Sequence, residues 1–208
     1  MKWKSHSASD RFAKVLAEDV HQAKIRMERD PTESHLREFI RATCSAIEAQ
    51  AWQLKMYVME QVLPKKASGH EIAALKEESY AINDKGEIYI QPKGYALKVG
   101  LRLVFSLLKK YEIPVDVDFS SKDWKNIDAA VKIRNRVMHP KSMSDISVSN
   151  ADAECCYRAF IYVHNMLLGT ILGSAMSALN KISSRDDRSK VESVDHNLAL
   201  ERTASNRH

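Results

Sequence analysis

Cysteine is scarce in this chain of 208 residues, which contains only three. Cys44 stands alone in a predicted helix, and Cys155 and Cys156 are adjacent, so the chain has neither a C-x-x-C pair nor a set of secretory disulfides. The N-terminal segment MKWKSHSASDRF lacks the apolar core of a signal peptide. Both absences favour the reducing cytoplasm as the location of the protein.

The sequence also lacks the common patterns that hold a metal ion or a nucleotide. Its eight histidines are scattered, with no H-x-x-x-H or H-E-x-x-H, and the adjacent cysteines do not have zinc spacing. Glycine occurs only six times and forms no phosphate-binding loop. No G-x-S-x-G elbow nominates a serine nucleophile, although a hydrolase triad stays open. We therefore expect no metal, no cofactor and neither P-loop nor Rossmann chemistry.

Long apolar runs are rare, and one needs a membrane test. Residues 159–180 carry no formal charge and contain Gly169-x-x-x-Gly173, followed by Ser177. Several polar residues in this run are costly in lipid, so we interpret it as a core helix and expect no membrane association. These residues are His164, Asn165, Thr170, Ser174 and Ser177. The small residues at four-residue spacing would let another backbone approach closely, in the same chain or in a second copy.

What the sequence does have is helical periodicity with a modest basic excess. Apolar residues recur at helical spacing over about residues 9–29, 34–63, 71–80, 95–111, 120–139 and 150–182. We therefore expect an all-α protein, an up-and-down helical bundle over residues 9–182 with a short irregular or extended insertion near 82–94. A turn is expected at residues 84–86. Residues 1–8 form an N-terminal tail, and residues 183–208 a disordered C-terminal tail.

The net charge of +5 belongs to residues 1–182, because the C-terminal tail holds five basic and five acidic residues. A basic body is compatible with nucleic acid as a partner.

The segment AVKIRNRVMHPK, residues 130–141, breaks the apolar pattern of its helix at one position. The helix begins after Ser120 and ends near His139, because Pro140 disfavours its continuation. Its apolar side is formed by Trp124, Ile127, Ala130, Val131, Ile133, Val137 and Met138. Arg134 falls in the middle of this side. It is either a buried arginine paired with a carboxylate or an arginine that binds phosphate in a cleft.

The predicted helix over residues 34–63 offers a partner for Arg134. Arg41, Glu48 and Lys55 lie at seven-residue steps along the edge of its apolar face. Glu48 is the leading candidate, although a solvated acid bonded to Lys55 or to another neighbour explains its position as well. His139 also has two explanations, a cation at a helix C-terminus or a proton-transfer group.

The motif RNRVMH, residues 134–139, fits R-N-x-x-x-H, the form most often seen for the R-x4-6-H motif of the HEPN superfamily of helical RNA-directed proteins. The surroundings are similar too: REFIRATCSAIEAQAWQLK at 37–55, LKEESYAINDKGE at 75–87 and DFSSKDWKNIDAAVKIRNRVMHPKSMSDISVS at 118–149. About residues 10–180 thus resemble stand-alone prokaryotic HEPN proteins of defence and toxin–antitoxin loci. The resemblance implies a helical bundle, and many such domains work as dimers.

The resemblance also implies a reaction, metal-independent cleavage of RNA that leaves a 2′,3′-cyclic phosphate and a 5′-hydroxyl. Carried over residue by residue, Arg134 binds the scissile phosphate, Asn135 positions its neighbours and His139 transfers protons. Arg136 and Lys141 are candidates for binding flanking phosphates, although plain solvated charges explain them as well. The expected partner is RNA.

One histidine per chain is an awkward complement for two proton transfers, so we expect a homodimer whose composite cleft contains two copies of Arg134 and His139. Two alternatives stay open. One is a non-catalytic helical interaction or RNA-binding module with Arg134 paired inside the core. The other is a toxin with the same chemistry, kept inactive by a cognate antitoxin or another regulatory protein.

Overall fold

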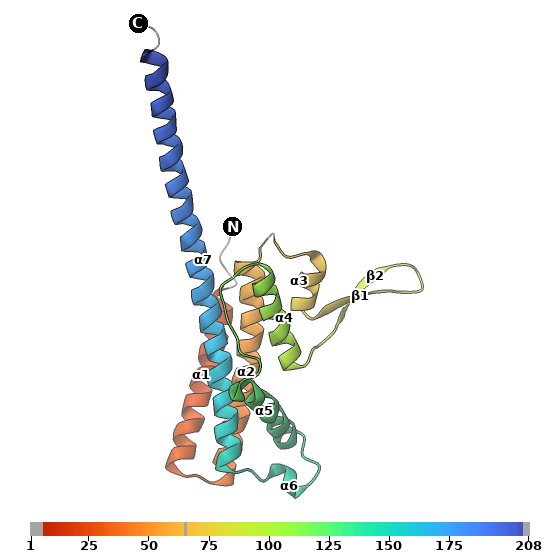
Figure 1. Cartoon of the computed structure of the whole chain (residues 1–208). Coiled ribbons are helices and arrows are strands. Elements are labelled where there is room, and N and C mark those ends of the chain that lie inside the picture. Colours follow the sequence, from red (N-terminus) through yellow and green to blue (C-terminus); the bar gives the residue numbers. More distant parts are fainter. Residues whose placement is uncertain (1–5, 65, 206–208) are drawn as a thin grey trace.

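The computed structural model describes the backbone of residues 6–64 and 66–205, and side chains up to Asn180 apart from those of residues 1–11, 13 and 65. The described chain consists mainly of helices (Figure 1). They are α1 His6–Arg29, α2 Glu33–Tyr57, α3 Gly69–Leu75, α4 Leu97–Lys110, α5 Lys122–Met138, α6 Met143–Ile146 and α7 Asn150–Ser205. The prediction of an all-α protein is confirmed, although α1 begins inside the predicted N-terminal tail.

The helix α2 lies at the centre of the bundle, where it packs against α1, α4, α5 and α7. Buried residues such as Cys44, Ala49 and Leu54 lie on different sides of it, as expected for a helix with neighbours on several sides. The helix begins after Thr32, whose hydroxyl accepts a hydrogen bond from the His35 amide at 3.3 Å. Its last turn widens into a π-helix over Val58–Val62.

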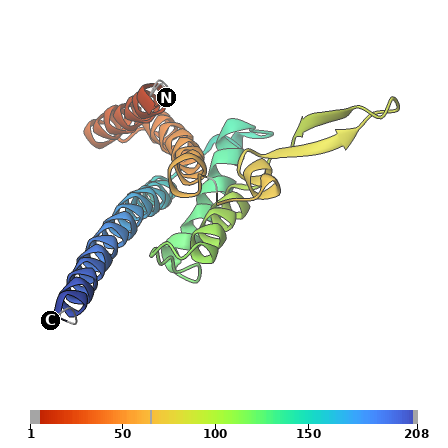
Figure 2. The ribbon, with the colours of Figure 1, turned by 90° about the horizontal axis from the view of Figure 1, so that it is seen from above.

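The third predicted helix, which extended to Tyr80, is too long. The helix α3 ends at Leu75, and Glu77 then adopts a left-handed backbone conformation with φ of 58°. The chain continues as strand β1, Glu78–Ile82, which pairs antiparallel with β2, Ile88–Pro92. The predicted extended insertion is therefore a hairpin. Figure 2 shows that it projects from the bundle in a different direction from the C-terminal part of α7.

The hairpin returns the chain so that α4 runs in the same direction as α2. Leu97 at the start of α4 lies near Ile47 in the middle of α2. Beyond the other end of α4, the Tyr111 hydroxyl donates to the carbonyl of Lys66, past the end of α2, at 3.0 Å. The alternating helix directions of an up-and-down bundle are thus interrupted at α4. A long connection leads from the end of α4 to the start of α5 (Figure 1).

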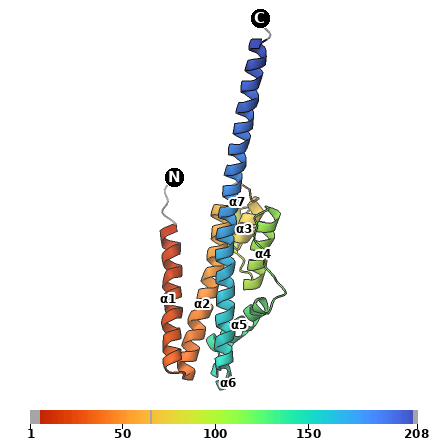
Figure 3. The ribbon, with the colours of Figure 1, turned by 60° about the vertical axis from the view of Figure 1, so that its left-hand side comes forward.

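The helix α7 is longer than the predicted last helix, which ended at Ile182. It continues to Ser205 and extends past the other helices (Figure 3). The predicted helix end is therefore wrong. The disorder predicted for residues 183–208 stays a prediction, because their side chains lie outside the described part of the chain.

One segment of α7, Asn150–Asn180, is long and apolar enough to cross a membrane by length and composition. Its inner face is nevertheless part of the core of the bundle. The residues of this inner face are Ala153, Cys156, Ala159, Val163, Met166 and Thr170. Close backbone approach is confirmed at Gly173, where a Cβ would lie 2.6 Å from the carbonyl oxygen of Pro114. A Cβ at Gly169 would meet no described atom within 4 Å.

Candidate functional site

The helix α5 carries the RNRVMH motif, and local contacts define both of its ends. The Ser121 hydroxyl accepts a hydrogen bond from the Trp124 amide at 3.1 Å, which caps the N-terminus. At the other end the His139 amide still donates to the carbonyl of Asn135, at 3.0 Å. The backbone then leaves the helix at His139, with φ of −129° and ψ of 58°, directly before Pro140. The predicted end of this helix is confirmed.

The predicted apolar side of α5 is only partly buried. Trp124, Ile127, Ala130 and Val137 are core residues. Val131 and Met138, by contrast, are 37% and 44% exposed. Arg134 therefore lies at the border of the buried face, with a side chain that is 32% exposed. It is not an arginine at the centre of the core.

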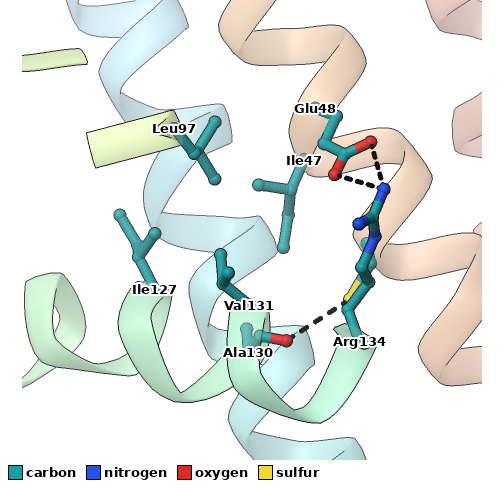
Figure 4. Close-up of a pocket in the computed structure, with 8 residues that line it drawn as sticks. Ile47, Glu48, Leu97, Ile127, Ala130, Val131 and Arg134 are labelled. Atoms are coloured by element: carbon teal, nitrogen blue, oxygen red, sulfur yellow. Dashed lines mark hydrogen bonds and ion pairs between the residues drawn. The ribbon is translucent and has the colours of Figure 1, made fainter. Parts of the chain in front are cut away.

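Arg134 reaches across to α2 and pairs with Glu48, the predicted partner (Figure 4). Its Nη2 lies 3.1 Å from Oε1 and 3.4 Å from Oε2 of Glu48. Its Nη1 donates to Oδ1 of Asn135 at 3.0 Å. The Glu48 side chain is 53% exposed, so water reaches this ion pair. The guanidinium is thus oriented by two side chains and still accessible to a ligand.

A small hollow lies beside the ion pair, between α2, α4 and α5 (Figure 4). It is lined by Cys44, Ile47, Glu48, Leu97, Ile127, Ala130, Val131 and Arg134. Its volume of about 10 Å³ is close to the space that one water molecule needs. A nucleotide does not fit there, so a phosphate has to approach Arg134 from the solvent side.

His139 presents an exposed side chain at the C-terminus of α5, and its ring makes no hydrogen bond within the described part of the chain. The loop that follows is held by Asp145. The Asp145 carboxylate accepts hydrogen bonds from the amides of Lys141 and Ser142, at 2.8 and 2.9 Å, and from the Ser142 hydroxyl at 3.0 Å. These bonds, first that from the Lys141 amide, lower the pKa of Asp145. The exposed imidazole therefore stands on an anchored loop.

Arg136 and Lys141, the two residues predicted to hold flanking phosphates, have different surroundings. The Arg136 guanidinium donates to the carbonyls of Asp145 and Ser147 and pairs with Asp152 at 3.3 Å. These contacts fix the loop between α5 and α7. Lys141 is exposed. A phosphate-binding role stays a prediction for both residues. To bind phosphate, Arg136 would have to use a guanidinium that already binds the loop.

The structure adds Arg41 to the surroundings of the motif. Its Nη2 donates to the carbonyl of Val137 in the last turn of α5, at 3.5 Å, and its side chain is otherwise exposed. Helix C-terminal carbonyls attract cations of this kind. The seven-residue step between Arg41 and Glu48 already indicated that both reach a neighbour, but it did not connect Arg41 with the end of α5.

The end of α5 thus combines guanidinium groups with an imidazole, which are groups suited to phosphate binding and proton transfer. Among the described residues, no three side chains of His, Cys, Asp or Glu gather as a metal-binding group. The function has to be inferred from these side chains themselves. Comparisons of the chain with protein-family models, with curated proteins and with solved structures give no match.

Proposed function

We propose that the protein is a metal-independent endoribonuclease of the HEPN type, and that Arg134 and His139 carry its reaction. The observation that carries the proposal is the environment of the Arg134 side chain. Glu48 and Asn135 orient its guanidinium, and the guanidinium is still accessible to a ligand from solvent. An exposed imidazole follows at the end of the same helix. A guanidinium fits phosphate oxygens with paired donors, and an imidazole exchanges a proton near neutral pH.

The reaction needs little from the protein because RNA brings its own nucleophile. A base removes the proton of the 2′-hydroxyl, the 2′-oxygen attacks phosphorus, and the 5′-oxygen leaves with a proton from an acid. The products are a 2′,3′-cyclic phosphate and a 5′-hydroxyl. In this proposal Arg134 stabilises the charge on the phosphoryl oxygens, and Asn135 holds its Nη1 in place. His139 exchanges the protons.

A homodimer completes the proposed site. One imidazole cannot at the same moment remove one proton and deliver another, whereas a two-fold dimer brings a second His139 and a second Arg134. The hollow beside Arg134 is also too small for a nucleotide. A cleft formed between two α5 ends would supply the space, and RNA would bind across it.

The resemblance to proteins of defence and toxin–antitoxin loci extends the proposal to a biological setting. In that setting the enzyme cleaves RNA of its own cell in the cytoplasm, and an antitoxin or another regulatory protein restrains it. Expression of the wild type should then arrest growth, and expression of the His139→Ala variant should not. Harmless expression of soluble wild type would oppose an unrestrained toxin.

A second candidate function follows from the Glu48–Arg134 ion pair itself. If Glu48 holds Arg134 permanently, the chain is a non-catalytic helical interaction or RNA-binding module. Glu48→Gln separates the two proposals because it removes the charge of the partner and keeps its shape. A module whose structure depends on the pair would lose stability in this variant. The enzyme would keep its fold and its cleavage within roughly tenfold.

Cleavage of mixed tRNA and mRNA by purified protein in EDTA tests the main proposal. The wild type should cleave at neutral pH, and the new ends should be 5′-hydroxyls. His139→Ala should lose about 100-fold or more in rate, as expected for a group that transfers protons. His21→Ala is the matched control, because His21 is an exposed histidine on α1. No cleavage by the wild type, or equal cleavage by both variants, would contradict the proposal.

A further inference from the structure

The helix α7 is apolar on two opposite sides, and only one of them is covered. Its inner face, defined above, lies in the core. At about 100° per residue, Leu168, Leu172 and Leu179 fall roughly opposite that face. They are 44%, 64% and 64% exposed. A helix that is apolar around its circumference is normally buried on all sides, so the outer side of α7 lacks a neighbour within the described chain.

The exposed side has a regular spacing, which we call the outer seam. Its residues are Ile161, Asn165, Leu168, Leu172, Ala175 and Leu179, all of them exposed. Successive members are separated by four, three, four, three and four residues, and Ile182 continues the spacing in the sequence. This is the heptad spacing by which one helix packs along another, with Asn165, Leu172 and Leu179 at a positions. A surface that contacts lipid or a loop does not require heptad spacing.

We infer that the outer seam pairs with the same seam of a second copy, as a parallel two-stranded coiled coil. A heptad seam that runs along the helix for three repeats is complementary to itself under two-fold symmetry. Asn165 sets the orientation, because an asparagine at an a position is satisfied by the same residue of a parallel, in-register partner.

The placement of α7 permits this pairing. The outer seam lies on the opposite side of the helix from the inner face, so two copies keep their bundles on the two outer sides of the pair. The C-terminal part of α7, beyond the outer seam, extends past the other helices (Figures 1 and 3).

The inference does not rest on the proposed ribonuclease. The residues of α7 that contact the α5 region, such as Cys155 and Tyr162, lie outside the seam. Pairing through α7 therefore does not by itself bring two α5 ends together, and a composite active site would use another surface. Molecular mass tests the seam, and RNA cleavage tests the site.

The full-length protein should be compared with Leu172→Asp/Leu179→Asp by light scattering at micromolar concentration. The wild type should be associated, and the double variant should have half its mass with the same circular dichroism, because both leucines are exposed in the single chain. Ile82→Asp/Ile88→Asp is the matched control, since both isoleucines are 71% exposed on the hairpin. It should keep the mass of the wild type. A monomeric wild type, or an unchanged mass of the seam variant, would overturn the inference.

A second variant tests orientation and does not depend on the folding of the first. Ala175→Cys places a thiol at a d position, and oxidation should link it to its copy in a parallel pair. The wild type, with its own three cysteines, is the control and should not form this product. An associated protein without this crosslink would overturn the parallel arrangement. A monomer that binds neutral lipid vesicles through the seam would show that the surface contacts a membrane instead.

Discussion

Two of the ion pairs that connect the central helix α2 with neighbouring elements differ in their access to water. Lys55 pairs with Glu77, and these side chains are 10% and 26% exposed. Seven residues earlier, Glu48 pairs with Arg134, and these are 53% and 32% exposed. The first pair is built into the bundle, next to Gly100 of α4. The difference shows that an ion pair of α2 can have either of two environments. The Lys55–Glu77 pair is enclosed and stabilises the fold, whereas the Glu48–Arg134 pair leaves the arginine accessible to a ligand.

The largest effect on stability is expected for Lys55→Ala. The substitution leaves the Glu77 carboxylate without its cation in a mostly buried position, which should lower the free energy of unfolding by about 3 kcal/mol. Replacing both partners, as in Lys55→Met/Glu77→Gln, should restore most of the loss. Urea denaturation measures both. A loss no larger than that of Arg134→Ala would remove the distinction between the two pairs.

A smaller effect is expected in α7, where one glycine is enclosed and another is open. A Cβ at Gly173 would also lie 2.9 Å from Cγ2 of Val115, so Gly173→Ala should cost about 1 to 3 kcal/mol. Gly169→Ala is the matched control and should stabilise the helix by about 0.5 to 1 kcal/mol. Thermal unfolding of both variants checks the signs. Equal changes in melting temperature for the two variants would mean that α7 does not pack against the connection between α4 and α5.

Acid should reveal another carboxylate that stabilises the fold. Glu71 accepts hydrogen bonds from Lys110 at 2.6 Å and from Ser68 and Tyr111, and the Lys110 ammonium makes the largest contribution to lowering its pKa. Because the folded pKa lies below the unfolded value of about 4.3, the stabilisation is present above that pH and decreases as the pH falls below it. The melting temperature of the wild type should therefore fall more steeply below pH 4.5 than that of Glu71→Gln. Parallel curves would contradict this role.

The sequence predicted the fold best where a local contact determines it. The Ser121 cap and the stop before Pro140 are short-range features, so the ends of α5 agreed with the prediction within two residues. Strand β1 was missed because its start depends on the left-handed backbone of Glu77. The Glu77 carboxylate pairs with Lys55 of α2. That contact is non-local and leaves no periodic signal.

The candidate site was predictable in part for the same reason. Seven-residue spacing placed Glu48 on the edge of its helix, and the pair with Arg134 exists. The exposure of the Glu48–Arg134 pair to water was not predictable. It depends on which other elements cover α5, and these leave Val131, beside Arg134, exposed as well. The contacts of Arg136 were also missed, since the loop to Ser147 folds back on it.

The most direct test of the central claim measures Arg134→Ala twice, in urea denaturation and in RNA cleavage in EDTA. We expect a loss of less than about 1 kcal/mol in unfolding free energy, because the pair with Glu48 is open to water. We expect a loss of about 100-fold or more in cleavage, because the guanidinium stabilises charge on the phosphate. Unchanged cleavage per folded molecule, together with a loss of several kcal/mol in stability, would contradict the account and assign Arg134 to the fold.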